Sequence, residues 1–347
     1  MTELNLHNTP QVNYKPSKSQ TLMTGVYRSG TEFISLLVSN HPDLSSTMYH
    51  VNGIRFIKDK YQDLSQISQL KQAVTDTANR LEERYSILLN SNKILNICDN
   101  VNVVNWAQLY DIIMSYLWLE KSNNIHWMEK CQLVWRSATS FIELMPNGKV
   151  ILIIRDPRAV LASFKKHTYA EPPAYLGAIF NCFDIFKLIC TELSFLENEK
   201  IIFIKYEDTV INPALTAERI YSFLGLRNFP LADKDSLRDA YGKSWHANSS
   251  FHDNTPGFDI NAAIERWKGN LSNEEISITE IVCGEYMEEL GYKLIKPKSK
   301  FSDIKKIMLE DSKIKYYFDR WEISGKGIQE FPSDPTNKNN WSENIVK

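Results

Sequence analysis

The run Val150–Ile154 constrains the fold of this chain more than any other segment. It consists of β-branched residues and leucine without interruption, which is typical of a strand buried on both faces of a parallel sheet. Arg155 ends the run, and Pro157 suits the first turn of a following helix. The alternation of helix and strand continues through Ala159–Lys166, Ala174–Asn198, Ile201–Lys205 and Leu215–Leu224. It predicts an α/β fold, with a central parallel sheet flanked by helices and joined by right-handed crossovers.

A second strand-to-helix junction lies near the N-terminus. Thr21–Gly25 reads as a strand and Gly30–Asn40 as an amphipathic helix, and Arg28 lies on the loop between them. The N-terminus of a helix attracts anions, because its first N–H groups lack intrahelical partners and the helix dipole is positive there. The junction therefore predicts an anion site. The backbone N–H groups expected to face the ligand are those of Ser29, Gly30 and Thr31.

This loop comes close to the phosphate-binding P-loop of nucleotide kinases without matching it. Gly25 and Gly30 have the right separation, but Thr31 and Glu32 stand where that motif needs Lys and Ser or Thr. The lysine that contacts a triphosphate and the hydroxyl that binds magnesium are therefore out of place. An ordinary strand-to-helix turn is the alternative reading of the loop taken alone.

Seven segments make the chain resemble the superfamily of sulfotransferases that use 3′-phosphoadenosine-5′-phosphosulfate (PAPS). They follow one another in the family's order between residues 20 and 292. The segments are Arg28–Thr31, Trp127–Lys130, Arg155–Arg158 with Ser163, Tyr206–Asp208 with the helix after Pro213, Asn248–Phe251, Arg266–Gly269 and Met287–Tyr292. Each segment alone is weak evidence for this family, whereas all seven in the family's order are strong evidence. The resemblance implies a P-loop-like sulfotransferase fold that converts PAPS into 3′-phosphoadenosine-5′-phosphate (PAP).

The same resemblance implies roles for individual residues. Arg28 would contact the bridging oxygen of the donor and stabilise the leaving phosphate, and Lys130 would neutralise charge on the moving sulfuryl group. Arg155 and Ser163 would hold the 3′-phosphate, while Arg158 either faces solvent or assists nearby. The other donor contacts that it implies are Ser29, Gly30, Thr31, Glu32, Tyr206, Ser249, Phe251, Arg266, Trp267 and Lys268. The alternative to a donor contact is a packing contact in the case of Ser163 and a position in the core in the case of Tyr206.

The general base is the role that the motifs leave open. Glycan and tyrosyl-protein sulfotransferases carry a glutamate a few residues beyond a His-Pro-Asp motif, and that position falls here on His50 or its neighbour Tyr49. The cytosolic branch instead carries a histidine two residues after the strand-end lysine, where this chain has Gln132. We therefore expect His50 to be the base, since imidazole accepts protons near neutral pH. A loop histidine without a catalytic role is the alternative, and His252 and Glu129 are the next candidates.

Composition is that of a soluble enzyme. The net charge of −2 argues against a general binder of nucleic acid or anionic membranes. The N-terminus lacks the apolar region of a signal peptide, and charges interrupt the apolar stretch Ala174–Phe195, which favours a buried helix over a membrane span. Neither the five cysteines nor the Asp, Glu and His residues have metal spacing. The sequence thus predicts a cytoplasmic protein with reduced thiols and no metal, as a monomer or homodimer.

Three parts of the chain are expected. Residues 1–18 form a flexible arm, residues 19–295 the sulfotransferase domain, and residues 296–347 a polar C-terminal extension. Within the domain, residues 53–120 form a helical insertion whose aromatic side chains suit the wall of an acceptor pocket. An ordinary position in the hydrophobic core is the alternative for these side chains.

The acceptor is predicted to be a small molecule, such as a bacterial secondary metabolite, sulfated on a hydroxyl or on an amine or guanidine nitrogen. A carbohydrate or tyrosyl-protein acceptor is the first alternative. The others are a P-loop nucleotide kinase, a protein that binds PAP without catalysis, and a scaffold that binds neither nucleotide.

Overall fold

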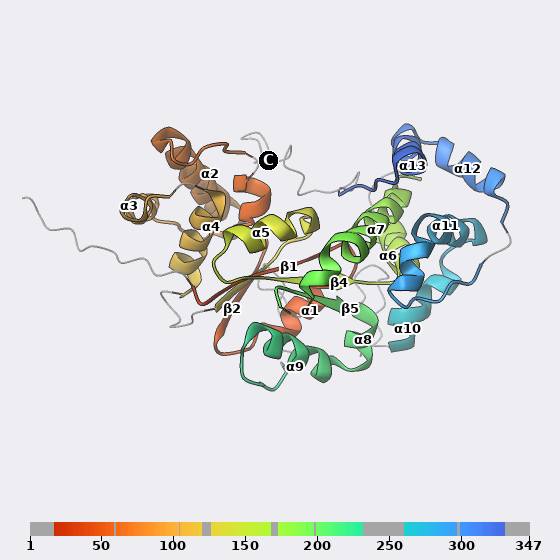
Figure 1. Cartoon of the computed structure of the whole chain (residues 1–347), viewed down its shortest axis with the longest axis horizontal. Coiled ribbons are helices and arrows are strands. Elements are labelled where there is room, and N and C mark those ends of the chain that lie inside the picture. The colour runs from red at the N-terminus through yellow and green to blue at the C-terminus, as the bar shows by residue number, and fades with distance from the viewer. Residues whose placement is uncertain are drawn as a thin grey trace, which may run out of the picture.

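A computed structural model describes residues 17–58, 60–103, 105–119, 126–167, 173–197, 199–231, 260–296 and 299–329. At its centre lies a parallel sheet of five strands in the order β2-β3-β1-β4-β5 (Figure 1). The strands are β1 (Ser19–Gly25), β2 (Leu44–Met48), β3 (His126–Lys130), β4 (Gly148–Ile154) and β5 (Ile201–Lys205). The predicted α/β fold with a parallel sheet is confirmed, although β2 had not been predicted.

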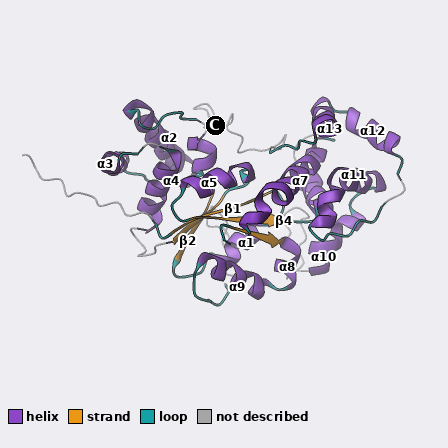
Figure 2. Cartoon of the chain, viewed as in Figure 1, coloured by secondary structure: helices purple, strands orange, loops and turns teal. Residues whose placement is uncertain are grey.

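Strand β4 shows why the sheet is parallel and covered on both faces. Val150 and Leu152 pack into one hydrophobic cluster, and Ile151 and Ile153 pack into a second one. All four are fully buried. Because successive side chains point to opposite faces of a sheet, an uninterrupted apolar strand requires cover on both sides, and helices lie on both sides of the strands (Figure 2).

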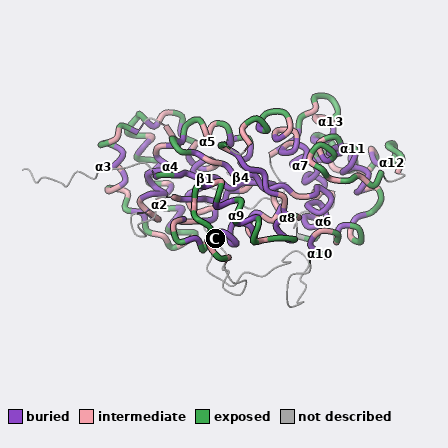
Figure 3. Tube along the Cα trace, turned by 60° about the horizontal axis from the view of Figure 1, so that its bottom comes forward, coloured by how far each residue is buried: buried purple, intermediate pink, exposed green. Residues whose placement is uncertain are grey.

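The helices divide between the two clusters. On one face lie α1 (Thr31–Val38), α8 (Tyr206–Ile211), α9 (Pro213–Leu224) and α10 (Ile260–Glu265). The larger cluster contains α2 (Ile67–Tyr85), α3 (Ser91–Val101), α4 (Trp106–Met114), α5 (Ala138–Leu144), α6 (Pro157–His167), α7 (Gly177–Leu188) and α11 (Asn273–Glu289). The chain is buried along the strands and exposed on the outer surfaces of the helices (Figure 3).

The expected helical insertion is helical in the structure. It begins with a π-helical turn at Ile54–Lys58, continues through α2, α3 and α4, and ends in a second π-helical turn at Ser115–Leu119. These helices lie at one end of the molecule, beside β2 (Figure 1). Asn105 begins α4 with a capping box, in which its side chain and that of Gln108 satisfy each other's backbone N–H groups.

The C-terminal part contains two helices that the polar composition did not indicate, α12 (Phe301–Leu309) and α13 (Ser312–Ser324). Helix α13 packs against α7, where the ring centroids of Tyr317 and Phe180 lie 6.0 Å apart. Phe318 is fully buried, and the N–H of Ile328 donates to the carbonyl of Phe180 at 3.2 Å. The two helices therefore extend the same hydrophobic core.

This packing gives a stability prediction. Phe318→Ala should lower the free energy of unfolding by about 3–5 kcal/mol, because it removes a fully buried ring and leaves a cavity. Ile323→Ala on the same helix is the control; its side chain is 84% exposed, so the change should stay within about 0.5 kcal/mol. Urea denaturation of the whole chain measures both values. Equal stability of the two variants would mean that α13 does not belong to the core.

Candidate active site

The two predicted strand-to-helix junctions meet at the carboxyl edge of the sheet. Nε of Arg28, on the loop after β1, donates to Oγ of Ser163 on α6 at 3.2 Å. Nη1 of Arg155, at the end of β4, donates to the carbonyl of Arg28 at 3.0 Å. Strands β1 and β4 are neighbours, so their ends deliver both arginines to one place. The structure thus brings together the three side chains assigned to the two ends of the donor.

Tyr206 closes the same place from the end of β5. A Cβ atom on Gly30 would lie 2.1 Å from Cδ2 of Tyr206, and Gly30 has a φ of 89°. Only glycine tolerates both the left-handed conformation and this approach. The guanidinium of Arg155 stacks 4.2 Å from the centroid of the Tyr206 ring. Tyr206 therefore packs between Gly30 of the loop and Arg155, which directly follows β4.

The electrostatics of this cluster favour an anion. Burial raises the pKa of Tyr206, and three arginines, Arg155, Arg28 and Arg266, act in the opposite direction. Burial lowers the pKa of Arg28, and the nearby charge of Arg155 lowers it further. Nε of Arg155 is buried and has no acceptor among the described residues. Buried polar atoms are almost always hydrogen-bonded, so this donor suits an anionic ligand.

The start of the loop differs from the expectation in one respect. Both the N–H and the hydroxyl of Ser29 donate to the carbonyl of Val26, at 3.1 and 2.7 Å. The prediction that the N–H of Ser29 faces a ligand is therefore wrong, because the turn itself uses that group. Thr31 begins α1 and is buried, while Glu32 in its first turn is half-buried. The carboxylate of Glu32 acts on the pKa values of both Arg28 and Lys130.

The late segment Arg266–Gly269 forms a 3₁₀ turn after α10. Arg266 is half-buried, Trp267 is buried, and Lys268 is exposed with its Nζ 2.6 Å from Glu265. Nη2 of Arg155 donates to the carbonyl of Ala263 at 2.8 Å and ties α10, which directly precedes the segment, to the site. The remaining predicted contacts, Ser249 and Phe251, and the alternative base His252 lie outside the described residues.

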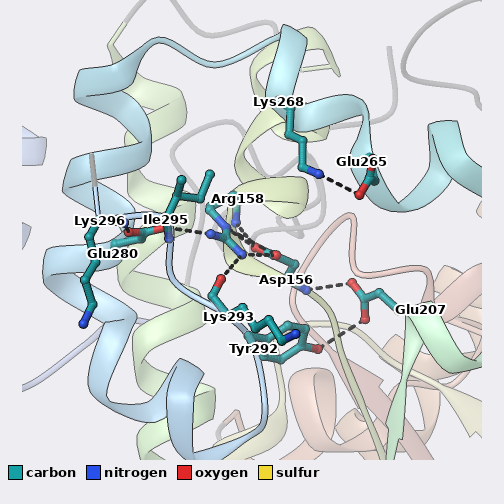
Figure 4. A network of polar contacts seen from close by, with 10 residues as sticks. All are labelled: Asp156, Arg158, Glu207, Glu265, Lys268, Glu280, Tyr292, Lys293, Ile295 and Lys296. Carbon is teal, nitrogen blue, oxygen red and sulfur yellow. Dashed lines mark hydrogen bonds and ion pairs between the residues drawn. The ribbon is translucent and has the colours of Figure 1, made fainter. Parts of the chain in front are cut away.

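Arg158 is buried, which excludes the first of its two predicted alternatives, a position facing solvent. Its guanidinium pairs with Asp156 at 2.6 Å and with Glu280 of α11 at 2.6 Å, and it also donates to the carbonyl of Lys293 at 2.9 Å (Figure 4). On its other side it stacks 4.2 Å from the Trp267 ring. Arg158 therefore links the turn after β4 to the C-terminal helices and to the late segment.

Lys130 ends β3 on the other side of β1. Its side chain is fully buried, and burial lowers its pKa to about 8. Nζ lies 3.8 Å from the ring centroid of Tyr49 and donates to the Tyr49 hydroxyl. Since β1 lies between β3 and β4, Lys130 and Arg155 approach the loop after β1 from opposite sides.

His50 is a weaker base than the sequence suggests. Nδ1 of His50 is hydrogen-bonded to the Thr47 hydroxyl and accepts from the N–H of Met48 at 3.3 Å. Its ring packs 4.4 Å from that of Tyr85 and 5.7 Å from that of Trp118. Burial lowers the pKa of His50 to about 4, and the charge of Arg80 acts in the same direction. The imidazole is therefore neutral at neutral pH, as a base must be, but it holds a proton weakly.

Glu129, the next candidate base, has both carboxylate oxygens engaged. They accept from the N–H groups of Val51 and Asn52, each at 2.8 Å, and from the hydroxyl of Tyr110. The side chain is fully buried, and burial raises its pKa. These contacts give Glu129 a structural role, which is to hold the loop that carries His50.

Comparison with known proteins identifies the family. The model of the sulfotransferase family matches residues 21–230, more than half of the 347 residues. The chain belongs to the sulfotransferase family. The matched residues include the loop after β1, Lys130, the Arg155–Ser163 element and Tyr206.

Curated relatives of this sulfotransferase are carbohydrate sulfotransferases. Carbohydrate sulfotransferase 4 of Mus musculus is 28% identical over 192 residues, which cover 48% of each chain. Carbohydrate sulfotransferase 1 of Homo sapiens is 29% identical over 173 residues, which cover 43% of this chain and 39% of the relative. The chain thus spans half or less of the length of these relatives.

A solved structure supports the fold. The sulfotransferase domain from the Synechococcus PCC 7002 olefin synthase aligns with a TM-score of 0.51 at 19% identity, over 82% of this chain and 98% of that domain. None of the described helices has the length and apolar character that crossing a membrane requires. The described residues also contain no group of three or more His, Cys, Asp and Glu side chains that could hold a metal ion.

Sequence reasoning underrated two side chains of this sulfotransferase. The motifs point to Tyr49 only as the alternative to His50 at the position of the base, and to Gln132 only as a departure from a family pattern. In the structure the Tyr49 hydroxyl donates to Oε1 of Gln132 at 2.6 Å, beside Lys130. The signal that could have found them is their position at the carboxyl ends of strands, where sites in parallel sheets lie: Tyr49 directly follows β2, and Gln132 is the second residue after β3.

The close approach of Gly30 and Tyr206 gives a binding prediction. Gly30→Ala should weaken PAP binding by about 10- to 100-fold, because the new methyl group displaces the Tyr206 ring at a cost of about 1–3 kcal/mol. Gly225→Ala is the matched control: Gly225 has a φ of 75°, and nothing lies within 4 Å of its added Cβ. It should lose roughly 1–2 kcal/mol of stability and keep its PAP affinity. Titration calorimetry measures both; unchanged affinity in Gly30→Ala would exclude Tyr206 from the site.

Proposed function

We propose that this sulfotransferase uses PAPS as its donor, transfers the sulfuryl group to a hydroxyl of an acceptor, and releases PAP. The observation that carries the proposal is the convergence of Arg28, Arg155 and Arg266 around Tyr206 at the start of α1. An amine or guanidine nitrogen is the second kind of acceptor group that this chemistry permits. A kinase would transfer a phosphoryl group to the same kind of acceptor. This chain lacks the lysine and the hydroxyl residue that a P-loop would place directly after Gly30.

The two ends of the donor would bind to different parts of the cluster. Arg155, Ser163 and Arg266 would hold the 3′-phosphate, and the unsatisfied Nε of Arg155 supports this assignment. The loop Arg28–Thr31 would hold the 5′-phosphosulfate at the N-terminus of α1. PAPS, when bound, supplies an activated sulfuryl group.

The chain itself would contribute position and charge. Transfer of this kind depends mainly on alignment and on charges placed in advance where negative charge develops. The Arg28 guanidinium would stabilise charge on the phosphate side, and the Lys130 ammonium would do so on the sulfuryl side. Burial of Lys130 strengthens that interaction, since charges attract more strongly where water is excluded. His50 would hold the acceptor and receive its proton.

A small-molecule acceptor fits the surroundings of His50, where Tyr85 and Trp118 from the helical insertion supply aromatic surface. A carbohydrate hydroxyl is the second candidate, favoured by the names of the curated relatives. Aromatic rings suit both classes. Mass spectrometry of reactions that contain PAPS and a panel of phenols, aliphatic alcohols and oligosaccharides distinguishes the two classes.

The donor assignment is tested by nucleotide binding. PAP should bind at least about tenfold more tightly than ADP, because each charged contact to the 3′-phosphate is worth roughly 1.5–3 kcal/mol. Calorimetry on the whole chain measures both affinities, with ATP and magnesium as a third titration. Equal affinity for PAP and ADP would overturn the donor assignment, and preferential binding of ATP would support a kinase.

The base assignment predicts an unusual pH dependence. If His50 receives the acceptor proton, kcat should stay nearly constant between about pH 7 and about pH 5, and fall as pH approaches the His50 pKa of about 4. His50→Ala should lose about 10²-fold in kcat and lack this acid limb, with unchanged PAP affinity. His126→Gln, at the opposite end of β3, is the control and should keep the wild-type profile. A wild-type rate in His50→Ala would place the base elsewhere.

A further inference from the structure

The turn that follows β2 has an unusual backbone. Tyr49 has a φ of 62° and Asn52 a φ of 46°. A left-handed conformation is uncommon for residues other than glycine, and for a bulky residue such as tyrosine it is an outlier. Such conformations persist only where the surroundings impose them, and they gather at functional sites.

Two buried charged side chains impose this turn from different elements. Glu129 of β3 accepts from the N–H groups of Val51 and Asn52, each at 2.8 Å. Arg80 of α2 donates to the carbonyl of Tyr49 at 2.6 Å and also to that of His50. The helical insertion thus holds the backbone of the turn on one side, and the sheet holds it on the other.

The side chain of Tyr49 joins Lys130 to the donor loop. Nζ of Lys130 donates to the Tyr49 hydroxyl, which donates to Oε1 of Gln132 at 2.6 Å. Nε2 of Gln132 then donates to Oγ1 of Thr31 at 2.9 Å. Four side chains from the ends of β2 and β3 and the start of α1 therefore form one chain of hydrogen bonds.

Lys130, at one end of this series of hydrogen bonds, fixes which atom donates and which accepts in each bond. An ammonium group has three donors and no acceptor, so the Tyr49 hydroxyl accepts from it and donates its own O–H to Oε1 of Gln132. Burial raises the pKa of Tyr49 well above its usual value, which keeps that proton in place. Thr31 accepts at the far end, which leaves its hydroxyl proton to be donated onward. Bonds aligned in this way polarise one another.

We propose that Tyr49 is a positioning residue for sulfuryl transfer, whose hydroxyl holds the Lys130 ammonium in line with the donor loop through Gln132 and Thr31. The inference rests on the proposed function, because Lys130 matters only if it faces the group in transfer. It accounts for the strained backbone at Tyr49, since a relaxed turn would carry the ring elsewhere. It also gives Gln132 a role in this chain, at a place where it cannot act as a base.

The charge of Lys130 supplies a readout that packing alone would not change. Burial lowers its pKa to about 8; Glu32 and Cys131 act to raise it, and Arg28 acts to lower it. Tyr49 accepts a hydrogen bond from the charged form and so favours it. In kcat/KM for PAPS, which reports the free enzyme, activity should fall as pH rises through this pKa. Loss of the Tyr49 hydroxyl should move that alkaline limb to lower pH.

The test is Tyr49→Phe, which removes the hydroxyl and keeps the ring beside Lys130. We expect kcat to fall by about 10- to 100-fold, the alkaline limb to move to lower pH, and the PAP affinity to stay within about twofold. PAP release from PAPS is followed with water and with the best acceptor of the panel. Tyr221→Phe on α9 is the matched control, because its buried hydroxyl has no hydrogen-bond partner among the described residues; it should behave as the wild type.

Gln132→Leu removes the hydrogen bonds of Gln132 with Tyr49 and Thr31. This variant keeps the test decisive if Tyr49→Phe does not fold, and calorimetry with PAP would reveal a failure to fold. Gln132 is only half-buried, and the variant should show the same loss of kcat with normal PAP binding. The proposal would be overturned if Tyr49→Phe kept the wild-type kcat and an unmoved alkaline limb. If Tyr49→Phe does not fold, the same result in Gln132→Leu would overturn it. A wild-type chain that neither binds PAP nor consumes PAPS would instead overturn the proposed function.

Discussion

The architecture of the site depends on one guanidinium, that of Arg155. Through its two terminal nitrogens it donates to the carbonyls of Arg28 and Ala263, and its plane lies 4.2 Å from the centroid of the Tyr206 ring. One side chain thereby joins the loop after β1, helix α10 and the residue that follows β5. Arginine suits this position, because its planar group is always charged, donates in several directions and stacks on aromatic rings. Its Nε has no acceptor among the described residues.

The two sides of the candidate site are supported by different parts of the chain. On the side of Arg155, Arg158 connects the turn after β4 to Glu280 of α11, which ties the C-terminal helices to the site (Figure 4). On the side of Lys130, Arg80 of the helical insertion holds the turn that carries Tyr49 and His50. The helices at the two ends of the molecule therefore support opposite halves of one site (Figure 1). Arg158 pairs with two buried carboxylates, so its support is sensitive to the loss of either partner.

Much of the donor side could be predicted from the sequence, because it is encoded locally. The apolar run before Arg155 defines a strand buried on both faces, and Pro157 marks the helix that follows it. Gly30 and Arg28 predict an anion-binding loop by the same local logic. Short-range patterns did not predict β2 (Leu44–Met48), because its polar residues do not form the apolar pattern of a strand. They did not predict α12 and α13 either, because the buried faces of these helices are narrow and lie within a polar segment.

The sequence by itself determined the parallel sheet, the loop at the start of α1 and the cationic residues at the strand ends, since each follows from neighbouring residues in the chain. Only the tertiary structure decided what those side chains do. It buried Arg158 between Asp156 and Glu280, lowered the pKa of His50 to about 4, and aligned Lys130, Tyr49, Gln132 and Thr31 in one chain of hydrogen bonds. The physical reason is that the residues that bury a side chain or hydrogen-bond to it can lie more than a hundred positions away in the sequence, as with Gln132 and Thr31. No local pattern specifies which of these distant residues meet.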